Sequence, residues 1–512
     1  MGHSFQFNDE TAVVKTTKGL VQGYEFDGLK IFKGIPYARA ERFMPPVEPE
    51  PWDDVFDATN FGAVPMIEDP TRPDNEMLVP HRFWPMSEDC QNLNVWTPGL
   101  DSEKRPVMVW IHGGGFTDGS AIEHITYDGD HAASIGNIVF VSVNHRLNIL
   151  GYSDLSDFGP EYWNSANAGM EDLVMALQWI RDNIGAFGGD PGNVTLFGQS
   201  GGGGKIATLM QMPAADGLYH KAVVISGLMT TTRAILPDKS WIPHKAMEVL
   251  GITTVEELKK VQYRQLVDAY VKVAGREVMR VFPMKNDYFY GYPTTFPFRP
   301  ETANVPLITG TVFSESTPFR YFPESTKGST REQEVQKVVD MIGREAADKV
   351  IPVFEKAYPG RPVSHLLWLE TFRRSIVKKY TKERAKFGPN TWQYVFDYDF
   401  PINHGLVAWH CSDIPFFFHD CELAPYTQGE GSALLEDRMF ESILAFMKTG
   451  DPATEALPWK PVTETESNTM MLDTAPEVRV NYDDELLPLL DEYVVPKVTE
   501  FLSTLKHKNA RA

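Results

Sequence analysis

The hydrophobic positions along the chain follow two alternating patterns. Between residues 171 and 184 the apolar residues recur at helical spacing, and helical patterns also cover 434–447 and 485–505. Short runs of consecutive apolar residues, typical of buried strands, occur at 106–111, 138–143, 194–197, 222–225, 306–309 and 391–396. Apolar strands that alternate with helices predict an α/β fold with a mostly parallel central sheet and helices on both faces.

Other parts of the chain depart from this alternation. Residues 12–37 predict short antiparallel strands, and residues 40–90, rich in Pro and Asp, predict a long ordered loop. The mostly helical segments at about 230–300 and 330–390 predict cap-like insertions over one end of the sheet. Because no repeat or clear linker divides the sequence, we expect residues 1–512 to form a single large domain.

Composition and charge exclude some classes of partner. The 512 residues are 42% hydrophobic, which suffices for a large core. Lys and Arg total 48 against 69 Asp and Glu, a formal net charge of −21, so nucleic acid is not an expected partner. No apolar run reaches the 18 residues of a membrane span.

The N-terminus and the cysteines bear on location. The first residues lack a basic stretch and an apolar segment, so no signal peptide is visible. Three cysteines, Cys90, Cys411 and Cys421, give no disulfide framework. We therefore expect a cytoplasmic protein, or a secreted one if a signal has been removed.

The pattern G-x-S-x-G at residues 198–202 is the first candidate for chemistry. It joins the apolar run 194–197 to a helical segment, and a sharp strand-to-helix turn would present Ser200 as a nucleophile. The pattern alone also fits a glycine-rich turn with an incidental serine. The nucleophile interpretation therefore requires a base, an acid and an oxyanion hole elsewhere in the chain.

A second glycine-rich segment, residues 112–116, directly follows the strand predicted at 106–111. Acyl transfer builds negative charge on a carbonyl oxygen, and backbone N–H groups without side chains in front of them can stabilise it. We expect the donors to be Gly114, Gly115 and Gly201. The alternative is a flexible glycine loop.

Several separated stretches resemble the type-B carboxylesterase family of the α/β-hydrolases. Residues 87–96 resemble its E-D-C-L-x-L-N segment, and residues 183–200 resemble its long serine signature. The likeness extends from about residue 12 to residue 500, and it is nearer to microbial members. It implies the α/β-hydrolase fold with helical caps, a single catalytic domain, and hydrolysis of carboxylic esters through an acyl-enzyme.

The resemblance also implies roles for particular residues. It suggests a catalytic triad of Ser200, Glu315 and His410 in that order. Ser226 matches a serine that supports the triad, and Arg42 and Glu88 match a structural ion pair. From the residues alone, Asp399 and Asp413 are rivals for the acid, and His404 is a rival for the base.

The sequence departs from the family pattern at the serine turn. Gln199, which we count as a supporting residue beside the nucleophile, stands where the family usually has Glu. Gly201 replaces the usual Ala, so we expect a less charged and looser turn. Cys90 keeps the family's cysteine, but residues 55–75 hold no cysteine to pair with it.

The expected substrate is a small ester, apolar or aromatic. Residues expected near the binding pocket are Phe116, Phe319, Phe416 and His404. We expect no cofactor and no metal, because the spacing of the histidines and cysteines at 404–421 matches no common zinc motif. A lactonase, amidase, thioesterase or non-catalytic binding protein on the same fold is the alternative, and the protein is expected to be a monomer or homodimer.

Overall fold

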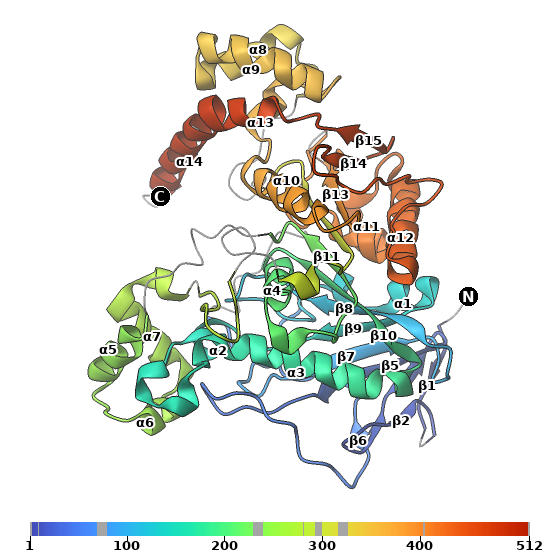
Figure 1. Cartoon of the computed structure of the whole chain (residues 1–512), viewed down its shortest axis with the longest axis vertical. Coiled ribbons are helices and arrows are strands. Elements are labelled where there is room, and N and C mark those ends of the chain that lie inside the picture. The colour runs from blue at the N-terminus through green and yellow to red at the C-terminus, as the bar shows by residue number, and fades with distance from the viewer. Residues whose placement is uncertain are drawn as a thin grey trace. The chain divides into compact units, whose positions relative to one another are not determined.

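A computed structural model describes residues 3–8, 10–68, 79–228, 239–279, 281–291, 299–315, 326–402 and 405–509. They form two compact units, shown in Figure 1. The first unit consists of the described residues within Met1–Asp74, Pro80–Leu307 and Leu444–Asp451. The second consists of those within Asn75–Val79, Ile308–Ile443 and Pro452–Ala512. The expectation of a single domain stays a prediction.

The first unit contains eight strands of the main sheet, in the order β1-β4-β5-β7-β9-β8-β10-β11. Strands β9, β8, β10 and β11 are mutually parallel, whereas β1, β4, β5 and β7 pair in antiparallel fashion. Their bounds are β1 Phe5–Gln6, β4 Tyr24–Phe26, β5 Leu29–Pro36, β7 Asn92–Thr97, β8 Arg105–Ile111, β9 Val139–Val143, β10 Gly189–Gln199 and β11 Lys221–Ile225. The predicted strands of this region are confirmed.

The core of the first unit lies around its parallel strands. All residues of β9 and β11 are buried, which explains why the sequence shows uninterrupted apolar runs there. Helices α1 (Asp130–Gly136), α3 (Ala168–Asn183) and α4 (Gly201–Leu209) pack against these strands. Figure 1 shows α3 lying across the sheet. A smaller sheet is formed by β2 (Val13–Lys15), β3 (Leu20–Gln22) and β6 (Phe56–Asp57).

The first unit also contains helices in the segment where the sequence predicts a helical insertion. They are α5 (Trp241–Leu250), α6 (Val255–Lys260) and α7 (Tyr263–Ala274), and the short α2 (Asn148–Tyr152) lies earlier in the chain. Thr254 and Glu257 form a capping box that fixes the start of α6. Gly251, in the left-handed conformation, ends α5, and Gly275, also with positive φ, ends α7.

The second unit contains the remaining strands of the main sheet, in the order β12-β13-β14-β15. They are β12 (Leu307–Val312), β13 (Thr391–Phe396), β14 (Asn468–Leu472) and β15 (Glu477–Val480). Strands β13 and β14 are parallel, and β15 is an antiparallel neighbour of β14. The sequence predicted β12 and β13, but it did not predict β14, β15 or, in the first unit, β7.

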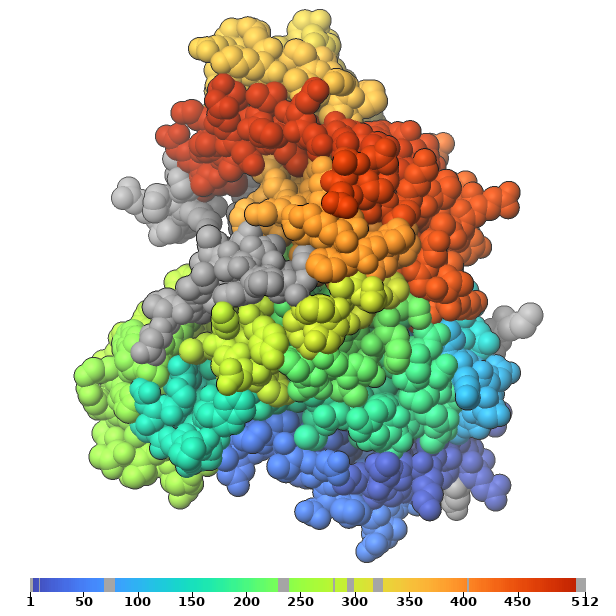
Figure 2. All heavy atoms as spheres, viewed as in Figure 1, coloured from blue at the N-terminus to red at the C-terminus, as the bar shows by residue number. Residues whose placement is uncertain are grey.

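Most helices of the second unit lie in the predicted segments. The helices in these segments are α8 (Arg331–Ile342), α9 (Arg344–Ala357), α10 (Phe372–Ala385), α13 (Leu486–Leu489) and α14 (Val495–Asn509). Helix α11 (Ile414–Phe418) lies where the sequence predicted no helix. Figure 2 shows α8 and α9 adjoining the red C-terminal segment, which they contact. A π-helical turn at Leu490–Val494 precedes Pro496, and the Val495 N–H donates to the Leu490 carbonyl. Helix α12 (Ser432–Thr449) contributes residues to both units.

Candidate active site

Ser200 lies at the sharp turn between β10 and α4. Its backbone angles, φ 53° and ψ −119°, are costly for a residue other than glycine. Two hydrogen bonds hold it there: the Ser200 N–H donates to the Ile225 carbonyl at 2.8 Å, and the Gly204 N–H donates to the Ser200 carbonyl at 2.9 Å. The strand, the strained serine and the helix have the geometry expected of a nucleophile turn.

The glycines around Ser200 permit close contact between backbones. A Cβ atom on Gly201 would lie 2.3 Å from the Gly115 nitrogen, and one on Gly202 would lie 1.9 Å from the Ile111 carbonyl oxygen. Real side chains do not approach so closely, so alanine at position 201 would displace the neighbouring loop. The expectation that Gly201 makes the turn looser is therefore wrong: the glycine lets the turn pack tightly against residues 113–115.

The 112–116 segment is shaped by two left-handed glycines. Gly114 has φ +77° and Gly115 has φ +66°, values that side chains rarely adopt. The Gly114 carbonyl accepts a hydrogen bond of 2.9 Å from the Asp118 N–H, which fixes the loop. Within the described part of the chain, the N–H groups of Gly114 and Gly115 have no hydrogen-bond acceptor. This loop therefore offers donors beside Gly201.

A buried cationic side chain lies behind this loop. Lys205, on α4, is fully buried, and its Nζ donates to the carbonyl oxygens of His112 at 2.9 Å and Gly113 at 3.3 Å. Burial lowers the pKa of Lys205 to about 7, against the opposing effect of Glu123 and Asp118. The sequence analysis did not single out Lys205, although a lysine within a glycine-rich helix was the available signal.

In the second unit, Glu315 and His410 are hydrogen-bonded partners. Glu315 follows β12, and its Oε2 accepts a hydrogen bond from His410 Nδ1. The Val312 N–H donates to Glu315 Oε1 at 3.3 Å, and the two segments are also joined by a backbone bond of 2.9 Å from Ser314 to Ala408. The predicted acid and base therefore lie side by side, while Ser200 belongs to the other unit.

Charged groups surround this pair. The Glu315 side chain is completely buried, and Arg373 Nη1 lies 3.7 Å from its Oε2. Burial raises the pKa of Asp413 to about 7, although a 2.9 Å hydrogen bond from the Tyr394 hydroxyl acts in the opposite direction. Burial also raises the pKa of Glu370, whose charge interacts with Arg373 and Glu315. The sequence analysis did not identify Arg373 or Glu370.

Two of the four residues expected at the substrate pocket lie in the described part of the chain. Phe116 is buried against Tyr152 and Phe282, and Phe416 is fully buried in an aromatic cluster. Such burial favours packing over direct substrate contact, and their roles in binding stay predictions. Phe319 and His404 lie outside the described residues.

Two further residues were matched to the family's supporting positions. Ser226 is buried with φ 48°, and its hydroxyl has no hydrogen-bond partner among the described residues, so its supporting role stays a prediction. The Arg42–Glu88 ion pair is confirmed, with Arg42 Nε donating to Glu88 Oε2 at 2.8 Å. Gln199 is buried at the end of β10.

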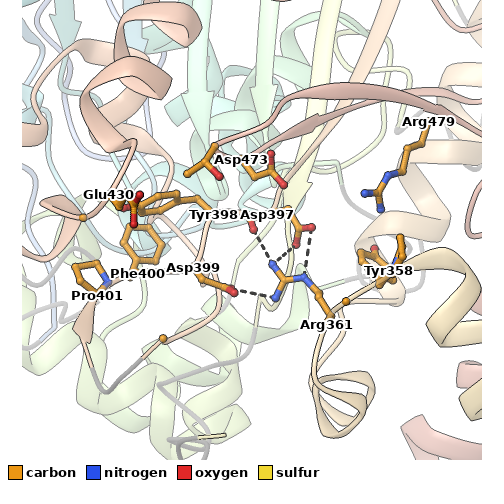
Figure 3. A pocket seen from close by; sticks show the side chains of 15 residues that line it. Tyr358, Arg361, Asp397, Tyr398, Asp399, Phe400, Pro401, Glu430, Asp473 and Arg479 are labelled. Carbon is orange, nitrogen blue, oxygen red and sulfur yellow. Dashed lines mark hydrogen bonds and ion pairs between the residues drawn. The ribbon is translucent and has the colours of Figure 1, made fainter. Parts of the chain in front are cut away.

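The second unit also contains a cavity of about 460 Å³ (Figure 3). Arg361 extends between Asp397 and Asp399, which follow β13, at 2.7 Å and 3.0 Å. Burial raises the pKa of both aspartates, and the guanidinium acts against that rise. Because Asp399 pairs with Arg361, it is engaged away from His410, and the network has the character of a structural ion cluster.

The described histidines of the segment 404–421 lie beside carboxylate groups. His410 bonds Glu315, and His419 Nε2 lies 2.9 Å from Asp437 Oδ1. The side chains of Cys90, Cys411 and Cys421 are buried and form no disulfide with one another. The part of the chain that the structure describes contains no group of His, Cys, Asp or Glu side chains arranged to hold a metal ion.

Comparison with known proteins identifies the family to which this chain belongs. The model of the carboxylesterase family matches residues 10–487, so the chain belongs to the carboxylesterase family and is a carboxylic ester hydrolase of α/β-hydrolase fold. No helix among the described residues has the length and apolarity needed to cross a membrane.

Individual relatives include bacterial ester-cleaving enzymes. A solved esterase from Clostridium hathewayi, described as able to hydrolyse aliphatic aromatic polyesters, is 41% identical with a TM-score of 0.91, covering 96% of this chain and 100% of that one. A para-nitrobenzyl esterase of Bacillus subtilis is 32% identical, covering 92% of this chain and 96% of its own. A phenmedipham hydrolase of Pseudarthrobacter oxydans is 32% identical, covering 87% and 92%.

Proposed function

We propose that Ser200, Glu315 and His410 form the catalytic triad of this ester hydrolase. The observation that carries the proposal is the hydrogen bond between His410 Nδ1 and Glu315 Oε2. It fixes the imidazole tautomer with Nε2 as the basic nitrogen. The strained conformation of Ser200 supports its role as the nucleophile.

The mechanism follows from these roles. Ser200 Oγ attacks the ester carbonyl carbon while His410 Nε2 takes its proton, and Glu315 stabilises the resulting imidazolium. The imidazolium then protonates the leaving alcohol, which gives the acyl-enzyme. Water attacks the acyl-enzyme with His410 again as base, and the acid is released as Ser200 recovers its proton.

The oxyanion hole belongs to the same proposal. Gly114, Gly115 and Gly201 supply the N–H donors, supported by the left-handed loop glycines and by the close packing of Gly201 on Gly115. In a water-poor site, each preorganised donor is worth about 3 kcal/mol of barrier. Such donors stabilise the tetrahedral intermediate more than the substrate, so they raise kcat.

The substrate we propose is a small apolar or aromatic ester. Support comes from the relatives named for para-nitrobenzyl esters and for aliphatic aromatic polyesters, and from the aromatic side chains expected near the site. In this proposal Phe116, Phe319, Phe416 and His404 shape the pocket, and Ser226 and Gln199 support the nucleophile. The protein acts without a cofactor, in the cytoplasm, as a monomer or homodimer.

The test compares wild type with Ser200→Ala on a panel of aryl esters of increasing acyl length, together with a lactone, an anilide and a thioester. We expect the wild type to prefer aryl esters and Ser200→Ala to lose at least ~10³-fold in turnover. Ser134→Ala, which changes an exposed serine on α1 whose hydroxyl donates to the Asp130 carbonyl, is the matched control and should keep most activity. Full activity in Ser200→Ala would contradict the assignment of the nucleophile.

A further inference from the structure

Lys205 is a buried cation whose partners are backbone carbonyl groups. It lies on the first turns of α4, five residues after Ser200, and is fully buried. Its Nζ donates to the carbonyl oxygens of His112 at 2.9 Å and Gly113 at 3.3 Å. Within the described residues, no carboxylate forms an ion pair with it. A lysine that served packing alone could be replaced by an apolar side chain at lower cost of desolvation.

The Gly113 carbonyl receives a second donor. His112 Nδ1 lies 3.1 Å from the Gly113 oxygen, so the imidazole N–H and the ammonium both act on this group. The same peptide unit carries the Gly114 N–H, one of the expected oxyanion donors. Hydrogen bonds to the carbonyl end of a peptide polarise it and strengthen its N–H as a donor.

The other two expected donors have the same arrangement. The Gly114 carbonyl, whose peptide carries the Gly115 N–H, accepts from the Asp118 N–H at 2.9 Å. The Ser200 carbonyl, whose peptide carries the Gly201 N–H, accepts from the Gly204 N–H at 2.9 Å. The carbonyl group of each of the three donor peptides therefore accepts a hydrogen bond. Of the three, only the Gly113–Gly114 peptide accepts one from a charged group.

We propose that Lys205 is a positioning residue for ester hydrolysis, which clamps residues 112–115 and polarises the peptide whose Gly114 N–H stabilises the oxyanion. The proposal rests on the function proposed above. In this proposal Lys205 does not contact the substrate. Its charge acts on the reacting oxygen through one peptide group, and this effect is greatest when the oxygen carries negative charge.

The charged surroundings of Lys205 make its ionisation testable. The groups that face it are Glu123 and Asp118, which favour the ammonium, and the imidazoles of His112 and His145. Burial and the nearby Lys205 hold the pKa of both histidines well below its usual range, so these rings are neutral. The pKa of Lys205 itself is lowered to about 7, so its charge changes near neutral pH.

The test uses Lys205→Gln, which keeps a neutral donor, and Lys205→Met, which keeps none. We expect kcat for an aryl ester to fall ~10-fold in Lys205→Gln and ~100-fold in Lys205→Met, with KM within about twofold of wild type. The inhibition constant of an aryl trifluoromethyl ketone, which adds to the serine as an oxyanion, should rise by the same factors. Lys221→Met removes a buried lysine that donates to Asn193, and it should change neither value.

A pH series separates polarisation by the charge from structural support. The ratio of kcat in wild type to kcat in Lys205→Gln should fall as pH rises from 6 to 9, because the wild-type lysine loses its proton. A pH-independent ratio, or an unchanged ketone affinity in folded Lys205→Gln, would overturn the proposal. If wild type itself neither hydrolyses the ester nor binds the ketone, the proposed function fails instead, so the two failures are distinguishable.

Discussion

Two buried cations, Lys205 in the first unit and Arg361 in the second, are held in different ways. In the first unit, Lys205 is bonded to the backbone carbonyls of a glycine loop, and the pKa of Lys205 is lowered to about 7. In the second unit, Arg361 lies between the carboxylates of Asp397 and Asp399, at 2.7 Å and 3.0 Å. The Arg361 guanidinium has an inherently high pKa, which Asp397 and Asp399 raise further, so its charge is fixed and ties segments together. Burial lowers the pKa of Lys205, so the charge of this lysine can titrate.

The contrast extends to the proposed site. The first unit contributes backbone: a strained serine, two left-handed glycines, and close packing at Gly114 and Gly201, where a Cβ would lie 2.2 Å and 2.3 Å from backbone atoms. The second contributes paired side chains, Glu315 and His410. We therefore expect catalysis to be impaired by added side-chain atoms in the first unit and by lost side-chain atoms in the second.

The largest expected effect is the loss of the imidazole. His410→Ala should lower kcat by at least ~10³-fold, because no other group then takes the Ser200 proton. Circular dichroism and a thermal unfolding curve would check that the fold is retained. His419→Ala, which removes a partly exposed histidine paired with Asp437, is the control. Near-normal turnover in His410→Ala would move the role of base to His404.

Removing the Arg361 side chain should lower the stability of the fold. Arg361→Leu leaves Asp397 and Asp399 unpaired, so we expect the free energy of unfolding to fall by about 3 kcal/mol in urea titration. Arg331→Leu breaks the exposed pair with Glu355 and should leave stability nearly unchanged. If both variants lose the same amount, the Arg361 cluster contributes no more than a surface pair.

Adding one methyl group at Gly201 tests the part of the proposed site that is formed by backbone groups. In Gly201→Ala, the new Cβ would meet Gly115 backbone atoms at 2.3–2.4 Å. The loop must move, so kcat should fall by ~10²-fold, about the loss of one oxyanion donor. Gly217→Ala is the control, because a Cβ there meets nothing within 4 Å, although its φ of +73° carries a small strain cost. A fully active Gly201→Ala would show that the loop yields without cost.

A smaller effect concerns stability against pH. Between its folded pKa of about 7 and its ordinary value of 10.5, Lys205 binds a proton more readily in the unfolded chain, so stability rises with pH in that window. Compared with Lys205→Met, wild type should gain about 1–2 kcal/mol between pH 7.5 and 9. Parallel stability curves for the two proteins would mean that the lysine is not titrating there.

The sequence predicted those features that depend on local pattern. Strands β8, β9, β10 and β11 appear as apolar runs because both faces of each are covered. Strand β7 was missed because it carries buried Asn92 and Asn94, which donate hydrogen bonds to the distant Ala63 carbonyl and Ser142 hydroxyl. The turn at Ser200 has a local signature, whereas Glu315 and His410 were selected through the family resemblance.

Other features depend on contacts that no single segment encodes. The close approach of Gly201 to Gly115 joins residues far apart in the chain, so the sequence suggested looseness where the structure has tight packing. The same holds for Lys205, which the helical pattern marks only as one position on α4. The role proposed for Lys205 follows from the carbonyl groups to which it donates hydrogen bonds.

The most direct test of the central claim is the site of covalent labelling. Wild type treated with an aryl fluorophosphonate should gain one phosphonyl group, and peptide mass spectrometry should locate it on Ser200. The account predicts no adduct in Ser200→Ala and slow labelling in His410→Ala, since the base that activates the serine is absent. An adduct on another residue, or undiminished labelling of Ser200→Ala, would contradict it.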